Sequence, residues 1–429
     1  MTPTTSDIRR AVLNQKRDVA AVFEALRAGS SVGEGVTRDS YGSGEEFAHR
    51  LIKQRAEALG LESHRDHAAN LFMTLAGTNR GAPRLMTGSH LDSVGNGGNF
   101  DGAAGVIAGL VAIKALQDLA VQSICDITTV AIRAEESVWF QVSYVGSRSA
   151  FGMLPLGALE ARRVDTGRTL ADHMRECGAN VDAVRSGEAS LQARSIRAFV
   201  ELHIEQSPQL IEAGLSIGIG TGVPGNFRYP AVNILGEYAH VGLARRFRRD
   251  VVLAASEFAI GLDEIWRAND AAGRPMAFTI GRFHTDPNEH ALTKVAGQLT
   301  LSLDVRAYAA AHLVDLEAQL FELVRDIERK RGVRFDLGAR TSAEVAPSHP
   351  GLFSRLTDHA KALGIPATPL ASPASHDTAT FIIAGVPSAM LFVRNANGSH
   401  NPREAMEIDD FLDGVSVLTG WLAAEARSP

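Results

Sequence analysis

The sequence predicts an α/β protein whose main domain is interrupted by a smaller α+β domain. At 429 residues the chain exceeds the roughly 100–200 residues of a typical domain, which favours two domains. Short apolar runs accompanied by helical patterns are typical of buried strands in an α/β sheet. The stretch 216–335 has a different rhythm, typical of a small α+β domain. We therefore predict a main domain of residues 1–215 and 336–429, with residues 216–335 inserted into it.

Four apolar runs of the main domain end in polar residues of the types that bind metals. They are "PRLMTGSHLD", "CDITTVAIRAEE", "AFVELHIEQ" and "SAMLFVRNANGSH". Helical patterns cover residues 42–59 and 102–119. In open α/β sheets, sites form beyond the carboxyl ends of the strands. The polar residues that end the four runs are therefore expected to share one site.

The inserted stretch contains its own strands and helices. Strand patterns occur in "RYPAVNILGEYAHVG" and "GQLTLSLDVRAY", and helical spacing occurs in "DVVLAASEFAIGLDEIWRAND" and "AAHLVDLEAQLFELVRDIERKRG". Runs that end in metal-ligand residues come both before and after this stretch. We therefore interpret it as an insertion rather than as a terminal domain.

Composition excludes several classes of protein. Hydrophobic residues make up 45% and charged residues 21%, as in ordinary globular proteins. The longest apolar run, "GVIAGLVAIKALQ", is interrupted by Lys114 and is too short for a membrane helix. The polar start of the chain lacks the apolar centre of a signal peptide, so a cytoplasmic location is expected. A net charge of −6 gives no reason to expect a nucleic-acid partner.

Two cysteines, Cys125 and Cys177, are too few for a thiolate metal cluster, so any metal must be held by nitrogen and oxygen. The stretch "TGSHLDSVGNGGNFDG" offers such ligands in His90 and Asp101. Its glycines let the chain turn after His90, and Asp92 can accept the other N–H of the imidazole. The ordinary alternative is a hydrogen-bonded histidine near a turn and an aspartate that only caps a helix.

Phosphate-binding interpretations of the glycine-rich segments are weak. A P-loop requires a lysine that follows its glycines, and this stretch has none. The sequence "GTGVPG" at residues 220–225 has dinucleotide-binding spacing, but a strand pattern follows where a helix should begin. The glycines therefore favour a metal site over a phosphate site.

Further candidate ligands end the other three runs. They are Glu135 and Glu136, His203 and His400. Adjacent strand residues point to opposite faces, so the two glutamates share one site only where the strand has ended or twisted. One could then bind a metal while the other takes a proton from metal-bound water. An aspartate that bridges two cations, with His and Glu as the outer ligands, is typical of two-metal hydrolases.

At these residues the sequence resembles the amidohydrolase family that contains N-carbamoyl-L-amino-acid hydrolases, β-ureidopropionases and allantoate amidohydrolases, relatives of the two-metal aminoacylases and carboxypeptidases. The resemblance runs nearly end to end. It is carried, in order, by "GVTRDSYGSGEE", "DHAANLF", "GSHLDSVGNGGNFDGAAGV", "AEE", "HIEQSPQL", "GRFHTDPNEH", "LSLDVR", "SHDTATF" and "NGSHNPREA". It implies a mixed-sheet, two-metal aminopeptidase-like catalytic domain with an inserted dimerisation or lid domain.

The resemblance also implies a role for each matching residue. The metal ligands would be His90, Asp101 as the bridge, Glu136, His203 and His400. Glu135 would be the general base and then the acid, and Asp92 the partner of His90. Substrate-binding positions would be Gln206, Arg228, Arg306 and His376, with Arg306 meeting the substrate carboxylate through its guanidinium fork. His240 would reach the active site of a second subunit and stabilise the oxyanion, which implies a homodimer.

Several segments depart from the family pattern. The usual "HAGTTPM" is here "HVGLARRFRRD", and "EEEGSRF" is "AEESVWF", which introduces the bulkier Val138 and Trp139. An expected asparagine is Thr293, and "SGAGHD" has become "SPASHD". The arginines of "ARRFRRD" could attract an anionic substrate, although such a charge run is more often a solvated face. His376 and the Asp377 that follows it could equally cap a helix.

The function predicted from these residues is metal-dependent hydrolysis of a linear amide, above all the carbamoyl group of an N-carbamoyl-L-amino acid or a similar ureido carboxylate. An aminoacylase or dipeptidase that acts on an N-acyl amino acid would use the same centre. A non-catalytic metal-binding dimer is a third alternative, against which the unliganded Glu135 argues. His and carboxylate ligands suit zinc, manganese, cobalt or nickel.

Overall fold

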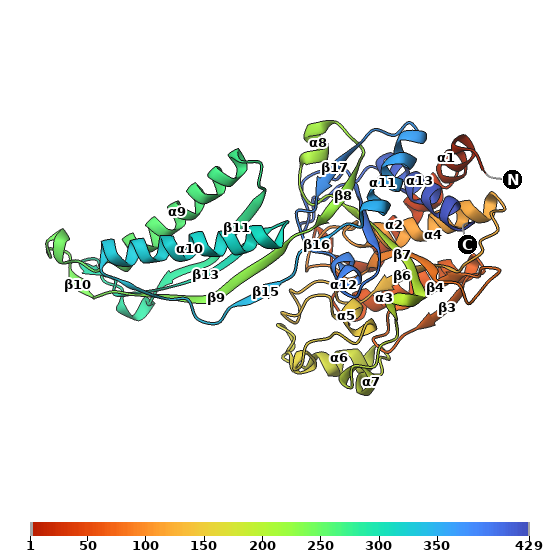
Figure 1. Ribbon diagram of the computed structural model, residues 1–429. Coiled ribbons are helices and arrows are strands. Elements are labelled where there is room, and N and C mark those ends of the chain that lie inside the picture. Colours follow the sequence, from red (N-terminus) through yellow and green to blue (C-terminus); the bar gives the residue numbers. More distant parts are fainter. Residues whose placement is uncertain (1–2, 428–429) are drawn as a thin grey trace. The chain divides into compact units, whose positions relative to one another are not determined.

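A computed structural model describes residues 3–427, which form two compact units (Figure 1). The larger unit contains the chain up to Val223 and again from Ser348, and the inserted unit runs from Pro224 to Pro347. No helix of the described residues is both long and apolar enough to cross a membrane.

The two boundaries of the inserted unit differ from the residues 216 and 335 expected from the sequence. Strand β8 (Ile217–Val223) pairs within the sheet of the larger unit, although it lies beyond the expected first boundary. Strands β14 (Arg334–Asp336) and β15 (Thr341–Ala343) pair with β9 (Gly225–Leu235) of the inserted unit. The boundaries depend on which sheet each short strand joins, and an apolar pattern does not contain that information.

The larger unit is built on a mixed sheet. Its strand order is β16-β8-β18-β7-β5-β6-β4-β3, with β17 beside β8. The four predicted strands are present as neighbours in its centre, and all of their mutual pairings are parallel. They are β5 (Arg84–His90), β6 (Ile127–Ile132), β7 (Ile196–Ile204) and β18 (Ser388–Val393). The other strands are β3 (Glu62–Arg65), β4 (Leu71–Leu75), β16 (Ala346–Pro347) and β17 (Ala367–Ala371).

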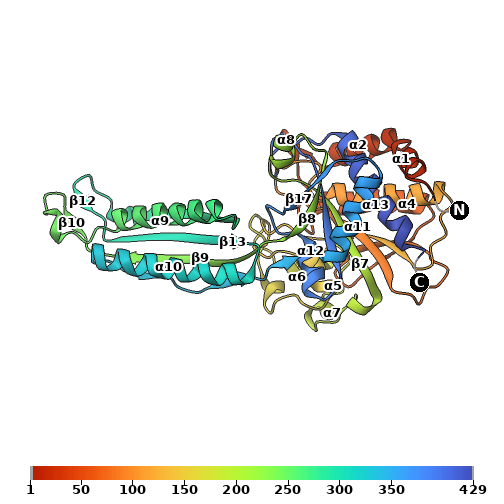
Figure 2. The same cartoon turned by 45° about the horizontal axis from the view of Figure 1, so that its top comes forward.

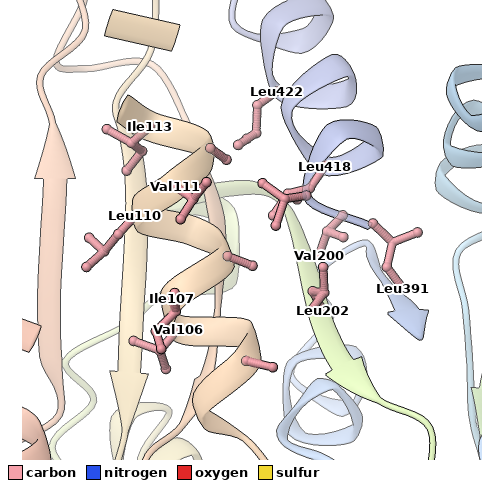
Figure 3. Packing of buried hydrophobic residues seen from close by; sticks show 14 of the residues in the cluster. Val106, Ile107, Leu110, Val111, Ile113, Val200, Leu202, Leu391, Leu418 and Leu422 are labelled. Atoms are coloured by element: carbon pink, nitrogen blue, oxygen red, sulfur yellow. The ribbon is translucent and has the colours of Figure 1, made fainter. Parts of the chain in front are cut away.

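Helices cover both faces of this sheet, and the alternation along β7 shows which face each helix covers. Val200 and Leu202 pack with helices α4 (Ala103–Asp118) and α13 (Ile408–Glu425) in the main apolar cluster (Figure 3). The intervening Phe199 points to the other face and stacks on Phe381 of α12 (Asp377–Ile383). Burial on both faces explains why β7 is mostly apolar.

Further helices pack around the larger unit. They are α1 (Thr5–Leu13), α2 (Lys16–Ser30), α3 (Ser43–Ala58), α5 (Val145–Ala150), α6 (Leu170–Glu176), α7 (Val181–Arg185), α8 (Gln209–Ala213) and α11 (Pro350–Ala362). The helices expected at residues 42–59 and 102–119 correspond to α3 and α4.

The inserted unit has a second sheet, of strand order β11-β13-β9-β14 with β15 beside β9. Strands β11 (Met276–Thr285) and β13 (Gln298–Ala307) are antiparallel neighbours. Helices α9 (Val251–Ala271) and α10 (Ala310–Arg331) run along the sheet and share one apolar cluster with it (Figure 2). The expected strands at 228–242 and 297–308 correspond to β9 and β13, and the apolar spacing of 250–270 and 310–332 forms α9 and α10.

Candidate metal centre

Two parallel strands bring the first pair of predicted ligands together. His90 is the last residue of β5, and His203 lies next to the end of β7. Both side chains are buried, and their ring centroids are 5.7 Å apart. His90 Nδ1 lies 3.2 Å from Asp92 Oδ1 and 3.1 Å from the Asp92 carbonyl oxygen. Because Nδ1 is thus engaged, Nε2 is the His90 atom left to face a metal.

Asp101 joins these two histidines. Its Oδ1 lies 3.2 Å from His203 Nε2 and 3.4 Å from His90 Nε2. Asp101 is not the N-cap of α4, because Gly102 occupies that position. The carboxylate of Asp101 faces the two histidines instead. Gly102 has a φ of 65°, and a Cβ at this position would lie 2.4 Å from His90 Cε1. The glycine is therefore required for the close approach of the Asp101 segment to His90.

The other oxygen of Asp101 faces a second group. Asp101 Oδ2 lies 3.4 Å from His400 Nε2, which lies 3.1 Å from Glu136 Oε1. His400 is seven residues beyond the end of β18 and has a φ of 60°. Its side chain is 48% exposed, whereas Glu136 and Asp101 are buried. Asp101 therefore belongs to two clusters, one with each of its oxygens.

The spacing of these atoms fits two divalent metal ions. Ligand atoms placed roughly 2.0–2.2 Å from an ion at tetrahedral angles are separated by roughly 3.3–3.6 Å. The four distances from a histidine Nε2 to a carboxylate oxygen given above run from 3.1 to 3.4 Å. The groups His90, Asp101, His203 and Asp101, Glu136, His400 could each hold an ion. Imidazole and carboxylate ligands suit zinc and the neighbouring divalent transition metals.

Asp92 also positions the segment that carries both glutamates. Its carboxylate accepts the backbone N–H groups of Glu135 at 3.1 Å and Glu136 at 3.2 Å. Strand β6 has already ended at Ile132, and Ala134 has a φ of 51°. Because the backbone is irregular here, the side chains of Glu135 and Glu136 need not point to opposite faces as they would in a strand, and both can lie at one site.

Glu135 is buried and makes no ion pair with the described residues around it. Its burial raises its pKa well above the ordinary value, while His90 acts in the opposite direction. The neighbouring carboxylates of Glu136, Asp377 and Asp92 raise the pKa further. A carboxyl group in such surroundings can hold a proton near neutral pH and release it again.

Three buried carboxylates that were not predicted from the sequence support this centre. Glu404 accepts the N–H of Asp101 at 3.2 Å. Ser399 Oγ lies within hydrogen-bond distance of both Glu404 Oε2 and Asp101 Oδ2, and its single proton can be donated to one of them at a time. Glu201 accepts from Ser89 Oγ at 2.6 Å. Glu45 on α3 accepts the N–H of Ala134 at 2.9 Å.

The signals for these carboxylates in the sequence were weak. Glu404 lies within the quoted "NGSHNPREA" and Glu45 within "GVTRDSYGSGEE", yet nothing in either motif distinguishes a ligand from a supporting residue. Glu201 is an acidic residue in the buried part of β7, between the apolar Val200 and Leu202, and that anomaly was the most useful indication of a buried polar network.

Gln206 and His376 lie beside the centre. Gln206 Nε2 donates to Asp101 Oδ2 at 2.8 Å. His376 occupies the N-cap position of α12, but its side chain makes no capping hydrogen bond. Its ring centroid lies 4.3 Å from that of His203, and its Nε2 has no hydrogen-bond partner among residues 3–427. Asp377 does not cap the helix either, because it accepts a hydrogen bond from Ser147 Oγ.

The remaining predicted residues belong to the inserted unit. Arg228 Nε donates to Asp304 Oδ2 at 2.7 Å, and Arg306 Nε donates to Asp304 Oδ1 at 3.2 Å. The two arginines thus converge on one carboxylate, which was not predicted from the sequence. His240, on the short strand β10 (Ala239–His240), is exposed and accepts the N–H of Gly242 at 3.1 Å.

The departures from the family pattern have different structural settings. Trp139 donates from its indole N–H to the Ser93 carbonyl oxygen at 2.9 Å, and the Arg163 guanidinium lies 4.7 Å from its ring centroid. Val138 beside it is 38% exposed. Trp139 therefore braces the loop that follows His90. Thr293 accepts the backbone N–H of Val241 through its own carbonyl oxygen at 2.7 Å, a bond that does not depend on its side chain.

Comparison with known proteins shows the family of the chain. Residues 86–424 match the family described as "Peptidase family M20/M25/M40". The chain belongs to the M20/M25/M40 family. M20 relatives cover nearly the whole chain, and they include amidohydrolases that act on carbon–nitrogen bonds of linear amides. The chain is accordingly a hydrolase of linear carbon–nitrogen bonds.

Two curated M20 relatives illustrate the similarity. An N-carbamoyl-L-amino acid amidohydrolase of Geobacillus stearothermophilus is 33% identical over 95% of this chain and 98% of its own length. An allantoate amidohydrolase of Escherichia coli (strain K12) is 33% identical over 93% of this chain and 96% of its own length. Among solved structures, an amidase of the hydantoinase/carbamoylase family from Burkholderia multivorans has a TM-score of 0.84 at 26% identity, over 96% of this chain and 98% of that chain.

Proposed function

We propose that this chain hydrolyses the carbamoyl group of an N-carbamoyl-L-amino acid or a closely similar ureido carboxylate, with two divalent metal ions per subunit. The observation that carries the proposal is the sharing of Asp101 between two ligand clusters beside the unliganded Glu135. The similarity to amidohydrolases of carbamoyl amino acids and of allantoate supports the choice of a ureido group.

In this proposal the chain supplies the ligands and the proton transfer. His90, His203 and Asp101 would hold one ion, and Asp101, Glu136 and His400 the other. When bound, the two ions would lower the pKa of water and polarise the carbonyl of the scissile amide. Glu135 takes the proton of the attacking water on its carboxylate and delivers it to the leaving nitrogen. Asp92 keeps both glutamates in place through their backbone N–H groups.

The substrate carboxylate is assigned to the inserted unit. Arg306, together with Arg228, offers guanidinium N–H groups that suit a carboxylate. Their convergence on Asp304 supports this role, because it shows that the two side chains can reach one carboxylate together. Gln206 and His376 would contact the substrate beside the metal ions. His240 would stabilise the developing oxyanion in a second copy of the chain, so the active form is a homodimer.

The test is ammonia release from N-carbamoyl-L-amino acids, N-carbamoyl-β-alanine and allantoate, with N-acyl-L-amino acids assayed for free amino acid. The protein is reconstituted with manganese, zinc, cobalt or nickel. Ammonia from a ureido compound that stops after chelation is the expected result. Amino acid release from N-acyl compounds alone would replace the proposal by an aminoacylase. Activity that persists without metal would refute the metal mechanism.

A variant separates catalysis from metal binding. Glu135→Gln is expected to lower kcat by a factor of roughly 10²–10⁴, since proton transfer is lost, while both ions remain bound. Glu212→Gln, which changes an exposed glutamate of α8 in the same unit, is the matched control and should retain full activity. Unchanged turnover in the Glu135 variant would show that this residue is not the base.

A further inference from the structure

The inserted unit contains a concavity of about 810 Å³ with a strongly basic lining. We call it the basic pocket. Its charged lining residues are Arg245, Arg246, Arg248, Arg249, Arg329, Lys330, Arg331 and a single acidic residue among those the structure describes, Glu237. Three segments that are distant in sequence contribute these residues. The fold therefore brings together basic residues from separate segments, and the positive charge does not come from a single run of basic residues.

The cations contributed by α10 have a structural explanation. Arg331 donates to Glu257 at 2.6 Å, Lys330 pairs with the same carboxylate, and Arg329 pairs with Asp326. Basic residues in the last turn of a helix also interact favourably with its dipole. These three residues do not require a ligand.

Of the four cations in the loop before α9, Arg249 also has an ionic partner, because it donates to Glu237 at 2.6 Å. The other three have none among the described residues. Arg245 and Arg246 form part of the short helix η3 (Arg245–Phe247), and neither makes an ion pair with residues 3–427. Arg248 donates to the carbonyl oxygens of Leu243 and Val241, which holds the loop in place without reducing its charge. These side chains therefore remain beside the α10 cations despite their like charge.

A neighbouring concavity shows that this excess of charge is local. It measures about 690 Å³, and Arg248 lines it as well. There the cations Arg248 and Lys294 are accompanied by Asp250 and Glu289. In the basic pocket, four of the seven cations have acidic partners, whereas Arg245, Arg246 and Arg248 have none among the described residues.

We propose that the basic pocket binds a polyphosphate group, either free or as part of a nucleotide. Several adjacent anionic groups can each meet a guanidinium fork, whereas one carboxylate would leave most of the charge unpaired. Phe247 lies at the pocket, is 58% exposed and has the Arg246 guanidinium 4.6 Å from its ring centroid. It provides an aromatic surface on which a nucleotide base can stack. This binding activity goes beyond amide hydrolysis, because no residue of the pocket belongs to the predicted metal centre.

The test is calorimetric titration of the full-length, metal-loaded protein with inorganic triphosphate and with ATP. The variant Arg245→Gln/Arg246→Gln removes two arginines that make neither an ion pair with the described residues nor a hydrogen bond that holds the loop. Arg17→Gln/Arg27→Gln removes two exposed arginines from α2 of the larger unit and is the matched control for net charge. It also reports any phosphate binding at the metal centre, because both double variants keep the same metal ligands.

Triphosphate is expected to bind the wild type and the control alike, and to bind the Arg245/Arg246 variant at least about tenfold more weakly. Equal affinities for triphosphate and ATP would support recognition of phosphates alone. Tighter ATP binding that Phe247→Ala removes would support a nucleotide. Absence of triphosphate binding, or equal weakening in both double variants, would overturn the proposal. So would a shift in sedimentation without phosphate binding, which would assign the arginines to a contact between copies.

Discussion

Asp101 can serve two clusters because the residue after it has no side chain. Gly102 adopts a φ of 65°, and its α-carbon lies where any Cβ would meet the His90 ring. The backbone N–H of the same glycine points to His203 Nε2 at 3.2 Å. The geometry of the centre therefore depends on one glycine as much as on the ligands themselves.

Gly102→Ala is expected to weaken metal binding, because the added methyl group must displace His90. Gly364→Ala is the matched control, since Gly364 has a φ of 68° with nothing within 4 Å of an added Cβ. Both variants carry the backbone strain of alanine at positive φ, of order 1 kcal/mol. Metal titration and urea unfolding measure the two effects separately. Equal metal affinity in the two variants would contradict the assigned role of Gly102.

At the scale of residues, the sequence predicted the set that the structure brings together. His90, Glu136 and His203 lie at or just beyond the ends of strands, which indicated a shared site, whereas Asp101 precedes a helix and its place in the ligand set followed from the family resemblance. The supporting carboxylates were not predictable in the same way. Glu404 and Glu45 accept hydrogen bonds from backbone N–H groups of segments far away in the sequence. Such contacts produce no recognisable motif or periodicity in the sequence.

Helix α3 connects the protein core to the glutamate segment. At its N-terminal end Glu45 accepts hydrogen bonds from the N–H groups of Tyr41 and Ala134, and forms an ion pair with Arg133 at 3.0 Å. Glu45 and Arg133 are both fully buried. A buried pair of this kind is destabilising when one partner loses its charge.

Glu45→Gln is therefore expected to lower the free energy of unfolding by about 3–5 kcal/mol and to disturb the position of Glu135. Glu46→Gln is the control, because Glu46 also pairs with Arg133 but is partly exposed, and it should have a much smaller effect. Urea unfolding and kcat report the two consequences. Similar losses in both variants would show that the Glu45 contact to Ala134 is unimportant.

A second prediction on α3 concerns pH. His49 is fully buried, neither ring nitrogen has a hydrogen-bond partner among the described residues, and burial lowers its pKa well below 6.5. The unfolded chain takes up a proton at His49 near pH 6.5, whereas the folded chain does not. The stability contributed by this residue is therefore complete above pH 6.5 and is lost as the pH falls below it.

His49→Leu should reduce the loss of unfolding free energy between pH 7.5 and 5.5, by up to about 1.4 kcal/mol per pH unit. Urea unfolding at both pH values measures this difference. His290→Gln, at an exposed position of the inserted unit, should leave the slope unchanged. An identical slope in wild type and His49→Leu would mean that His49 is already protonated in the folded protein.

At the scale of elements, apolar periodicity predicted the long segments well. Strands β5, β6, β7 and β18 and helices α4, α9 and α10 formed where the pattern indicated them. Strand β11 was missed because it is mostly exposed or half-buried, so its sequence lacks a continuous apolar run. The short strands β14 and β15 acquire their identity only by pairing with β9.

For the whole molecule, the proposed homodimer makes a prediction that mixing of subunits can test. Glu135→Gln and His240→Ala are each expected to be nearly inactive alone. In a refolded equal mixture, about half of the dimers contain both variants, and one of their two sites has both Glu135 and His240 from the partner. Activity should return to about one quarter of the wild type. No return in a mixture shown to exchange subunits would place His240 outside the neighbouring site.

The interruption of the larger unit has a consequence for synthesis of the chain. Strand β18 lies between β8 and β7 in the sheet, yet it is made after the whole inserted unit. The inserted unit is continuous, so it can fold as soon as it has left the ribosome. The sheet of the larger unit cannot be completed until the central strand β18 has been synthesised. His400, which follows that strand, arrives last of the predicted ligands, so an unfinished chain holds the first cluster without the second.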